Sequence, residues 1–274
     1  MFTFTHYIRY SLYQKRKNLL MLLNNLEKFE AKIKSGKIAY GVCISLADPT
    51  VTELAADAGF DFCWIDMEHG VMTDSDLMKH IMTLRGTNCA PIVRVAANTH
   101  THIKKVIDLV PAGIIAPMIN TAEEAEAMVD ACRFPMDGGS RGCGFRRANA
   151  FGLWSTDEFF KASKTDPWVI PQIEHIDAVR NLDAILKVKG IASICIGPYD
   201  LSASMGKPGQ FDDAEVKSAI EEICAKTLKA GIVLGAYGED IPLWKMRGVQ
   251  WLSVTNDIFA MAKKFKEILS TAEQ

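Results

Sequence analysis

Eight short apolar runs, separated by longer stretches of mixed polarity, constrain the fold of this 274-residue chain more than any other feature of its sequence. The runs occupy residues 39–45, 62–67, 91–95, 113–118, 168–173, 192–197, 232–237 and 250–254. They are continuously apolar, as expected of parallel strands that are buried on both faces. The segments between them have helical periodicity, and one of them begins at Thr121, where Glu124 is placed to complete a capping box.

Strands that alternate with helices in this way predict an α/β fold, a TIM (β/α)8 barrel, for which about 250 residues is a usual length. The alternative is an open doubly wound sheet, which would more often have a glycine-rich phosphate loop after its first strand. This chain instead has L-A-D-P at residues 46–49. We therefore expect a single barrel domain at residues 36–274, preceded at residues 1–35 by an N-terminal extension and a covering helix. An organelle-targeting segment is the alternative for residues 1–25, which are basic.

Composition excludes several classes of protein. The net charge of −2 gives no general attraction to nucleic acid. No apolar run approaches the length of about 18 residues that a membrane-spanning helix needs. The seven cysteines are scattered and form no C-x-x-C pair, which argues against a disulfide framework or a zinc–thiolate site. We expect a cytoplasmic enzyme that acts on small molecules, without a nucleic-acid or membrane partner.

Charged and polar residues follow the apolar runs at the positions where the active sites of TIM barrels lie. They are Asp66, Glu68 and His69 after the second run, Arg94 in the third, Gln172, Glu174 and His175 at the fifth, and Asp200 and Ser202 after the sixth. A single acidic residue at such a position is more often a helix cap or a salt-bridge partner than a catalytic group. Several charged strand ends on one rim are costly to bury unless they are paired or bind a metal, so together they indicate a functional site.

Glu174 and Asp200 end neighbouring predicted strands, which in a parallel sheet lie about 4.8 Å apart. Two carboxylates at that separation repel each other unless one is protonated or a cation bridges them. An all-oxygen pair suits Mg²⁺ or Mn²⁺ better than zinc. Two protein ligands leave coordination positions open for a substrate that chelates through a carboxylate and an adjacent carbonyl, as pyruvate does.

Six stretches together carry a resemblance to a known family. They are G-F-D-F-C-W-I-D-M-E-H (59–69), P-I-V-R-V (91–95), A-P-M-I-N-T-A-E-E-A (116–125), S-R-G-C-G (140–144), Q-I-E (172–174) and I-G-P-Y-D-L-S-A-S-M-G (196–206). The chain resembles the 4-hydroxy-2-oxoheptanedioate aldolase/2-dehydro-3-deoxyglucarate aldolase family of metal-dependent pyruvate aldolases. The similarity covers about residues 34–262, in order and in spacing.

The resemblance implies roles for the charged residues. Glu174 and Asp200 would be the metal ligands, with Co²⁺ as a further candidate beside Mg²⁺ and Mn²⁺. Arg94 would contact the keto oxygen of pyruvate and stabilise the enolate. His69, held by Asp66, would act as the acid/base group through a metal-bound water. Such roles agree with general chemistry, because a metal and an arginine stabilise negative charge, and histidine exchanges protons near neutral pH.

The resemblance also implies the reaction and the assembly. The backbone at Gly197 and Pro198 would cradle the pyruvate carboxylate, and Gln172 would contact the bound substrate. The enzyme would reversibly cleave a 4-hydroxy-2-oxo acid to pyruvate and an aldehyde through a metal-bound pyruvate enolate. Relatives exchange C-terminal helices, and residues 258–269 have the apolar spacing for that role, which implies a homo-oligomer, a hexamer built from dimers. The alternative is that this helix packs on its own barrel.

Other functions stay open on the same scaffold. One is another enolate lyase: an oxaloacetate decarboxylase, a macrophomate-synthase-like enzyme or a CoA-ester lyase. A metabolite-binding barrel without turnover is a third reading. The residues at 70–72 and Tyr199 depart from the family pattern beside the expected aldehyde pocket. Arg146 and Arg147, in a long connection at residues 135–152, could meet an anionic aldehyde or form a solvated or intersubunit cluster.

Overall fold

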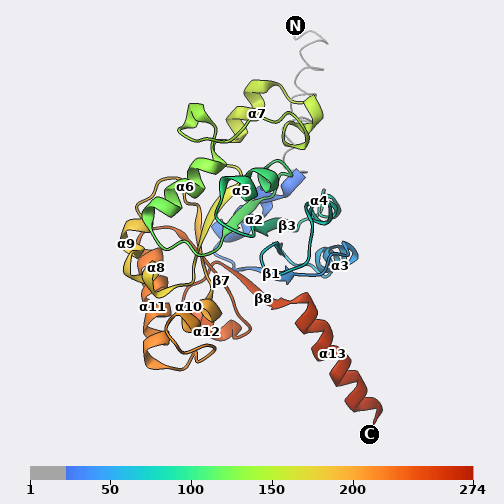
Figure 1. Ribbon diagram of the computed structural model, residues 1–274. Helices are drawn as coiled ribbons and strands as arrows, with labels where there is room; N and C mark the ends of the chain where they lie inside the picture. Colours follow the sequence, from blue (N-terminus) through green and yellow to red (C-terminus); the bar gives the residue numbers. More distant parts are fainter. Residues whose placement is uncertain (1–22, 274) are drawn as a thin grey trace.

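The computed structural model describes residues 23–273, and its central feature is a closed barrel of eight parallel strands in sequential order (Figure 1). The strands are β1 (Ala39–Ile44), β2 (Phe62–Asp66), β3 (Ala90–Arg94), β4 (Gly113–Ala116), β5 (Trp168–Ile173), β6 (Ser193–Ile196), β7 (Val233–Tyr237) and β8 (Trp251–Asn256). The predicted TIM barrel is confirmed, and no strand boundary differs from its prediction by more than two residues. Residues 1–22, most of the predicted N-terminal extension, lie outside the described part of the chain.

Aromatic side chains fill the N-terminal half of the barrel interior. The rings of Phe62 and Trp251 meet edge to face, with centroids 5.5 Å apart. Glycines make room for them: a Cβ at Gly41 would lie 2.4 Å from the Phe62 ring, and one at Gly235 would lie 1.8 Å from the Trp251 ring. Because the interior is packed in this way, the space for a ligand lies at the C-terminal ends of the strands.

Helix α2 (Leu26–Lys34) covers the N-terminal end of the barrel. Its buried face includes Phe29, whose ring lies 5.6 Å from that of Phe62 and 5.3 Å from that of Trp168. The Trp168 indole also donates a hydrogen bond of 2.8 Å to Glu30. This end of the barrel is therefore closed by apolar packing, and it leaves one open end for chemistry.

The remaining helices surround the barrel. They are α3 (Thr50–Asp57), α4 (Asp74–Thr83), α5 (His100–Ile107), α6 (Ala122–Cys132), α8 (Ile176–Arg180), α9 (Leu182–Ile185), α10 (Pro198–Ser204), α11 (Ala214–Lys229) and α12 (Ile241–Met246). The predicted capping box is present at the start of α6, where Thr121 and Glu124 bond each other's backbone N–H. No helix among residues 23–273 is long and apolar enough to cross a membrane.

The long connection between α6 and β5 folds into a small helical lobe. It contains η1 (Pro135–Asp137), η2 (Arg147–Gly152) and α7 (Thr156–Ala162). Phe134, Trp154 and Phe159 form its apolar cluster, together with Leu23 from the N-terminal segment. Figure 1 shows this lobe and helix α13 extending from the barrel in opposite directions.

The last helix, α13 (Asp257–Ala272), projects from the barrel (Figure 1). Its apolar side chains are 37–68% exposed, and they are Ile258, Phe259, Met261, Phe265, Ile268 and Leu269. The alternative that this helix packs on its own barrel is therefore wrong for the described chain. Only Asp257 in the helix is buried, where its carboxylate accepts hydrogen bonds from the backbone N–H groups of Ser45 and Leu46.

Candidate active site

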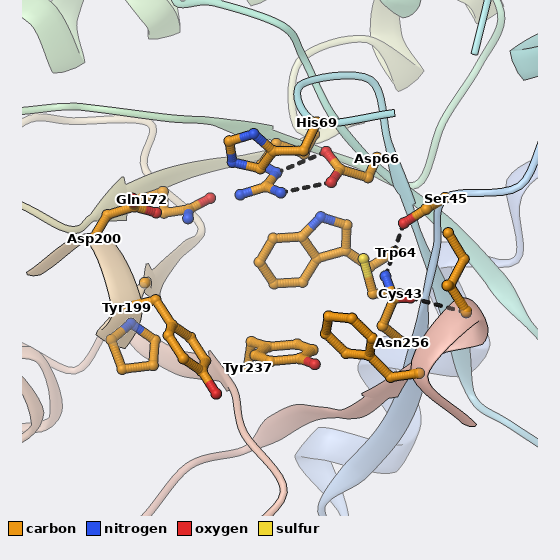
Figure 2. A pocket seen from close by; sticks show the side chains of 15 residues that line it. Cys43, Ser45, Trp64, Asp66, His69, Gln172, Tyr199, Asp200, Tyr237 and Asn256 are labelled. Atoms are coloured by element: carbon orange, nitrogen blue, oxygen red, sulfur yellow. Dashed lines mark hydrogen bonds and ion pairs between the residues drawn. The ribbon is translucent and has the colours of Figure 1, made fainter. Parts of the chain in front are cut away.

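A cavity of about 510 Å³ opens at the C-terminal ends of the strands (Figure 2). Every strand except β4 supplies a lining residue within it or directly after it, and the first turns of α10 and α13 complete the wall. Of the residues predicted for the site, Asp66, His69, Arg94, Gln172, Gly197, Pro198 and Asp200 line this cavity. Glu174 does not line the cavity; it is buried and accepts a hydrogen bond from Gln172, which does.

Arg94 is held in one orientation by two carboxylates. Strands β2 and β3 place Asp66 directly opposite Arg94. The Arg94 Nε donates to Oδ1 of Asp66 at 2.9 Å and Nη2 donates to Oδ2 at 2.6 Å, while Nη1 lies 3.0 Å from Oε2 of Glu68. The guanidinium also lies over the Trp64 ring, 5.2 Å from its centroid. Burial works against its charge, but the hydrogen bonds and charges of Asp66 and Glu68 outweigh burial and raise the pKa of Arg94.

The structure changes the expected partner of His69. Both oxygens of Asp66 are hydrogen-bonded to Arg94, and Oδ1 also accepts the backbone N–H of Glu68. The imidazole Nε2 of His69 lies instead 3.6 Å from Oε2 of Glu68, and the His69 side chain is 64% exposed. The prediction that Asp66 holds His69 is thus not what the described chain shows. The reason is geometric: Asp66 ends a strand opposite Arg94, whereas His69 lies three residues beyond the strand, on a loop.

Glu174 is the most deeply buried carboxylate of the site, with 2% of the residue exposed. Its Oε1 accepts the backbone N–H of Met118 at 2.7 Å, and its Oε2 accepts a hydrogen bond from the Gln172 amide. Burial raises the pKa of Glu174 to about 7; the Met118 hydrogen bond opposes this, and the negative charges of Glu68 and Asp200 add to it. Three acidic groups therefore interact at one place.

The side chains of Glu174 and Gln172 pack closely against the backbone at Gly197. A Cβ at Gly197 would lie 2.5 Å from Oε2 of Glu174 and 2.8 Å from Nε2 of Gln172, so any larger residue would collide with both side chains. Asp200 follows three residues later in the first turn of α10 and is exposed to the cavity. The G-P-Y-D sequence thus brings a carboxylate to the rim, and its glycine allows Glu174 and Gln172 to pack against the end of the strand.

The donor set fits a hard divalent cation. Glu174 and Asp200 offer carboxylate oxygens, and the buried Oε1 of Gln172 has no hydrogen-bond partner among the described residues. Residues 23–273 contain no group of three or more histidine, cysteine or acidic side chains arranged to hold a metal ion. A cation here would therefore take its other ligands from substrate or water oxygens, as Mg²⁺ does at sites with one or two carboxylates.

Several lining residues were not predicted. They are Cys43, Ser45, Trp64, Tyr237, Asn256, Ile258 and Phe259. Ser45, Tyr237 and Asn256 end or follow apolar runs, so a search for polar residues at the ends of these runs could have found them. Ile258 and Phe259 belong to a helix that carries no such signal. Burial raises the pKa of the Cys43 thiol to about 12, so this group stays protonated and is not a nucleophile at neutral pH.

Arg146 and Arg147 do not line the cavity of their own chain. Arg147 is buried in the helical lobe and its Nε donates to the carbonyl of Leu109 at 3.0 Å. Arg146 is exposed and donates to the carbonyl of Phe145. Neither guanidinium is therefore placed to receive an anionic aldehyde within this chain.

Comparison with known proteins agrees with this geometry. The sequence profile of the HpcH/HpaI aldolase/citrate lyase family matches residues 39–241. The chain belongs to this family. It is 30% identical over 252 residues to a hydroxypyruvate/pyruvate aldolase of Roseobacter denitrificans, covering 91% of this chain and 98% of the relative. It is 32% identical over 248 residues to a 5-keto-4-deoxy-D-glucarate aldolase of Salmonella paratyphi A, covering 89% and 96% of the two chains.

Solved structures support the same assignment. A HpcH/HpaI aldolase/citrate lyase family protein from Burkholderia cenocepacia superposes with a TM-score of 0.84 at 26% identity, covering 89% of this chain and 98% of that one. The resemblance noted from the motifs is thus confirmed. As an HpcH/HpaI-family protein that aligns with aldolases over nearly its whole described length, the chain is a carbon–carbon lyase.

Proposed function

We propose that this lyase reversibly cleaves a 4-hydroxy-2-oxo acid to pyruvate and an aldehyde, with a divalent metal ion as cofactor. One observation carries the proposal: a buried arginine anchored by Asp66, the carboxylate of Asp200 and an amide oxygen of Gln172 that has no hydrogen-bond partner in the described part of the chain meet at one cavity. A 2-oxo acid needs both a cation-binding site for its oxygens and fixed positive charge for the enolate that cleavage produces.

The reaction can be followed atom by atom. Cleavage breaks the C3–C4 bond, the electron pair passes to C3 as the enolate, the hydroxyl on C4 loses its proton, and C3 gains a proton to give pyruvate. When bound by Glu174 and Asp200, the cation supplies Lewis-acid stabilisation of charge on the 2-oxo oxygen. Arg94 stabilises the same charge with a guanidinium whose orientation Asp66 fixes.

Other side chains bind the substrate or move protons. The backbone at Gly197 and Pro198, which line the cavity, binds the substrate carboxylate, and Gln172 offers an Oε1 that has no hydrogen-bond partner among the described residues. His69, exposed at the rim, exchanges the proton of the C4 hydroxyl. Decarboxylation of oxaloacetate shares the enolate but has no such hydroxyl proton, so it would depend on Arg94 and not on His69.

We further propose the identity of the metal, the cellular location, the domain limits and the oligomeric state. The metal is Mg²⁺ or Mn²⁺, because the donors are oxygens. The protein is cytoplasmic, in keeping with seven free cysteines. It consists of an extension at residues 1–35 and a barrel at residues 36–274. It forms a homo-oligomer, a hexamer built from dimers, through the exposed apolar face of α13.

Metal removal tests the proposal. Treatment with excess EDTA should abolish cleavage of a 4-hydroxy-2-oxo acid, decarboxylation of oxaloacetate and exchange of the pyruvate methyl protons, and added Mg²⁺ or Mn²⁺ should restore all three. Glu174→Gln and Asp200→Asn should bind the metal more weakly in calorimetric titrations, whereas Asp212→Asn, an exposed carboxylate outside this cavity, should not. Full activity in EDTA, or trapping of a lysine with pyruvate and borohydride, would overturn the proposal.

A further inference from the structure

The active-site cavity has two chemically different halves. Figure 2 shows Asp66, His69, Gln172 and Asp200 along one side, and Tyr199 and Tyr237 across the cavity from Asp66 and His69, with Trp64 between them. The polar side holds the groups assigned above to the 2-oxo acid. The electrophilic carbon of the aldehyde must reach the enolate from the remaining space, so the aromatic side receives the rest of the aldehyde.

Positive charge is confined to the polar half. Arg94 is the only lysine or arginine among the described residues that line the cavity, and its guanidinium is already paired with Asp66 and Glu68. A carboxylate on the aldehyde would lose its hydration in the aromatic half without gaining a cationic partner from this chain, which is costly.

A second hollow of about 300 Å³ lies beyond the aromatic side and shares Pro198, Tyr199 and Tyr237 with the first. Phe211 and Trp244 extend its apolar lining, and the Tyr199 ring meets that of Phe211 edge to face at 4.9 Å. Its charged lining is mostly acidic: Asp212, Glu239 and Asp240. Among residues 23–273, the one cation in its lining is Arg247, which is paired with Glu221 at 2.9 Å and lies over the Trp244 ring.

The cavity as a whole is larger than two small substrates require. Cavities of about 300–1,000 Å³ hold drug-sized ligands, and 510 Å³ exceeds what pyruvate and a two-carbon aldehyde would fill. Tyr199 is 58% exposed, so much of its ring is available to a ligand. Stacked or edge-to-face contact with Tyr199 and Tyr237 would bury an aromatic or aliphatic group, and the acidic rim beyond would repel an anion.

We propose that the aldehyde partner of this enzyme is uncharged and carries an aromatic or apolar group, which packs on Tyr199 and Tyr237. This inference rests on the proposed aldolase function and specifies its substrate class. Tyr199 is the specificity-determining residue, because it stands at the junction of the two hollows.

The test uses neutral and anionic aromatic aldehydes, of which 4-formylbenzamide and 4-formylbenzoate have nearly the same size and differ in charge. Rates of aldol addition to pyruvate are measured with the Mg²⁺- or Mn²⁺-loaded enzyme for benzaldehyde, 4-formylbenzamide and 4-formylbenzoate. We expect kcat/KM for both neutral aldehydes to exceed that for the carboxylate by about ten-fold or more, as for a pocket that leaves a charge unpaired. Equal values, or a preference for the carboxylate, would overturn the inference.

Two variants test whether the preference for neutral aldehydes arises at Tyr199. Tyr199→Arg should raise kcat/KM for 4-formylbenzoate relative to benzaldehyde by about ten-fold or more. Met246→Arg adds the same charge on the exposed face of α12, outside both hollows, and should not change this ratio. An equal change in both variants would contradict the role of Tyr199, and if Tyr199→Arg does not fold, Tyr199→Ala should lower kcat/KM for benzaldehyde more than for acetaldehyde.

Pyruvate methyl-proton exchange by the wild-type enzyme distinguishes a failure of the proposed aldolase function from a failure of the inferred aldehyde class. Exchange needs the enolate but no aldehyde. If exchange is absent with Mg²⁺ or Mn²⁺ present, the proposed function itself fails. If exchange proceeds and the carboxylated aldehyde is preferred, only the inferred substrate class fails.

Discussion

At the scale of single residues, the site is organised by the pairing of Asp66 with Arg94. The two hydrogen bonds between them are buried and charge-assisted, at 2.9 and 2.6 Å, and they fix the plane of the guanidinium. His69 has no comparable anchor among the described residues and lies near Glu68 instead. Asp66 is therefore expected to act through Arg94 and not through His69.

Variants at these three positions should fall into two groups. Arg94→Ala should impair aldol cleavage, oxaloacetate decarboxylation and pyruvate methyl-proton exchange alike, by about 10²–10³-fold, because all three pass through the enolate. Asp66→Asn should follow the same pattern with a smaller loss. The variant keeps the positive charge of Arg94 but removes the carboxylate that fixes the orientation of the guanidinium. His69→Ala should impair cleavage by about 10²–10⁴-fold and decarboxylation far less.

The comparison is read as a ratio of the two activities in each variant, with metal content measured first. An Asp66→Asn enzyme that loses cleavage but keeps decarboxylation would show that Asp66 serves His69, as the motif resemblance implied. Equal losses of both activities in His69→Ala would show that His69 is not the group that handles the hydroxyl proton.

At the scale of elements, the helical lobe is joined to the N-terminal segment by a buried polar contact. The Asn24 amide donates to both carboxylate oxygens of Asp166, each at 3.0 Å, at the point where the lobe returns to β5. Burial raises the pKa of Asp166 to about 7, although the Asn24 hydrogen bonds and the charges of Arg141 and Arg133 oppose the shift. The lobe is thus held to the barrel partly by a titratable group.

This contact predicts a pH dependence of stability. The folded-state pKa of Asp166 lies above its unfolded value, so between about pH 4 and pH 7 the folded state holds a proton that the unfolded state has lost. The contribution of this group to the free energy of unfolding therefore falls as pH rises through that window, by at most about 1.4 kcal/mol per pH unit. Above pH 7 it is constant.

Asp166→Asn removes the titration while keeping an acceptor for Asn24. The variant should gain stability relative to the wild type between pH 4.5 and pH 7.5 in urea titrations, with no further gain above that range. Asp130→Asn, a carboxylate on α6, serves as the control and should not reproduce the trend. A difference between wild type and Asp166→Asn that is independent of pH would refute the assignment.

At the scale of the whole molecule, α13 is the clearest sign of assembly. Its apolar side chains are exposed along the helix, and its first turn lines the active-site cavity. A contiguous apolar face of this kind usually marks an interface between proteins. Association through α13 would therefore place an interface at the mouth of the cavity.

Charge on this face should disrupt the oligomer. Phe265→Asp should lower the mass measured by light scattering at micromolar concentration, because a carboxylate would be buried without a partner. Ser270→Asp, in the same helix but off the apolar face, should leave the mass unchanged. A wild-type protein that is already a monomer under these conditions would contradict the proposed assembly.

Local sequence patterns were sufficient to predict the barrel and half of its site. Eight continuous apolar runs define buried parallel strands, and polar residues at their ends must meet at one rim because the strands are parallel. This reasoning placed Asp66, His69, Arg94, Gln172 and Asp200 at one cavity, whereas Gly197 and Pro198 came from the family resemblance. The capping box at Thr121 is likewise a local feature, set by residues three positions apart.

Tertiary structure decided which of these groups interact. The pairing of Asp66 with Arg94 depends on the register between β2 and β3. Strands that are buried on both faces are continuously apolar, so they lack the alternation that would specify this register. The aromatic half of the cavity combines Tyr199 of α10 and Tyr237 of β7, which are distant in the sequence. Such contacts arise only when the barrel closes. In the closed barrel, side chains meet because their strands are neighbours around the ring, even where they are far apart in the sequence.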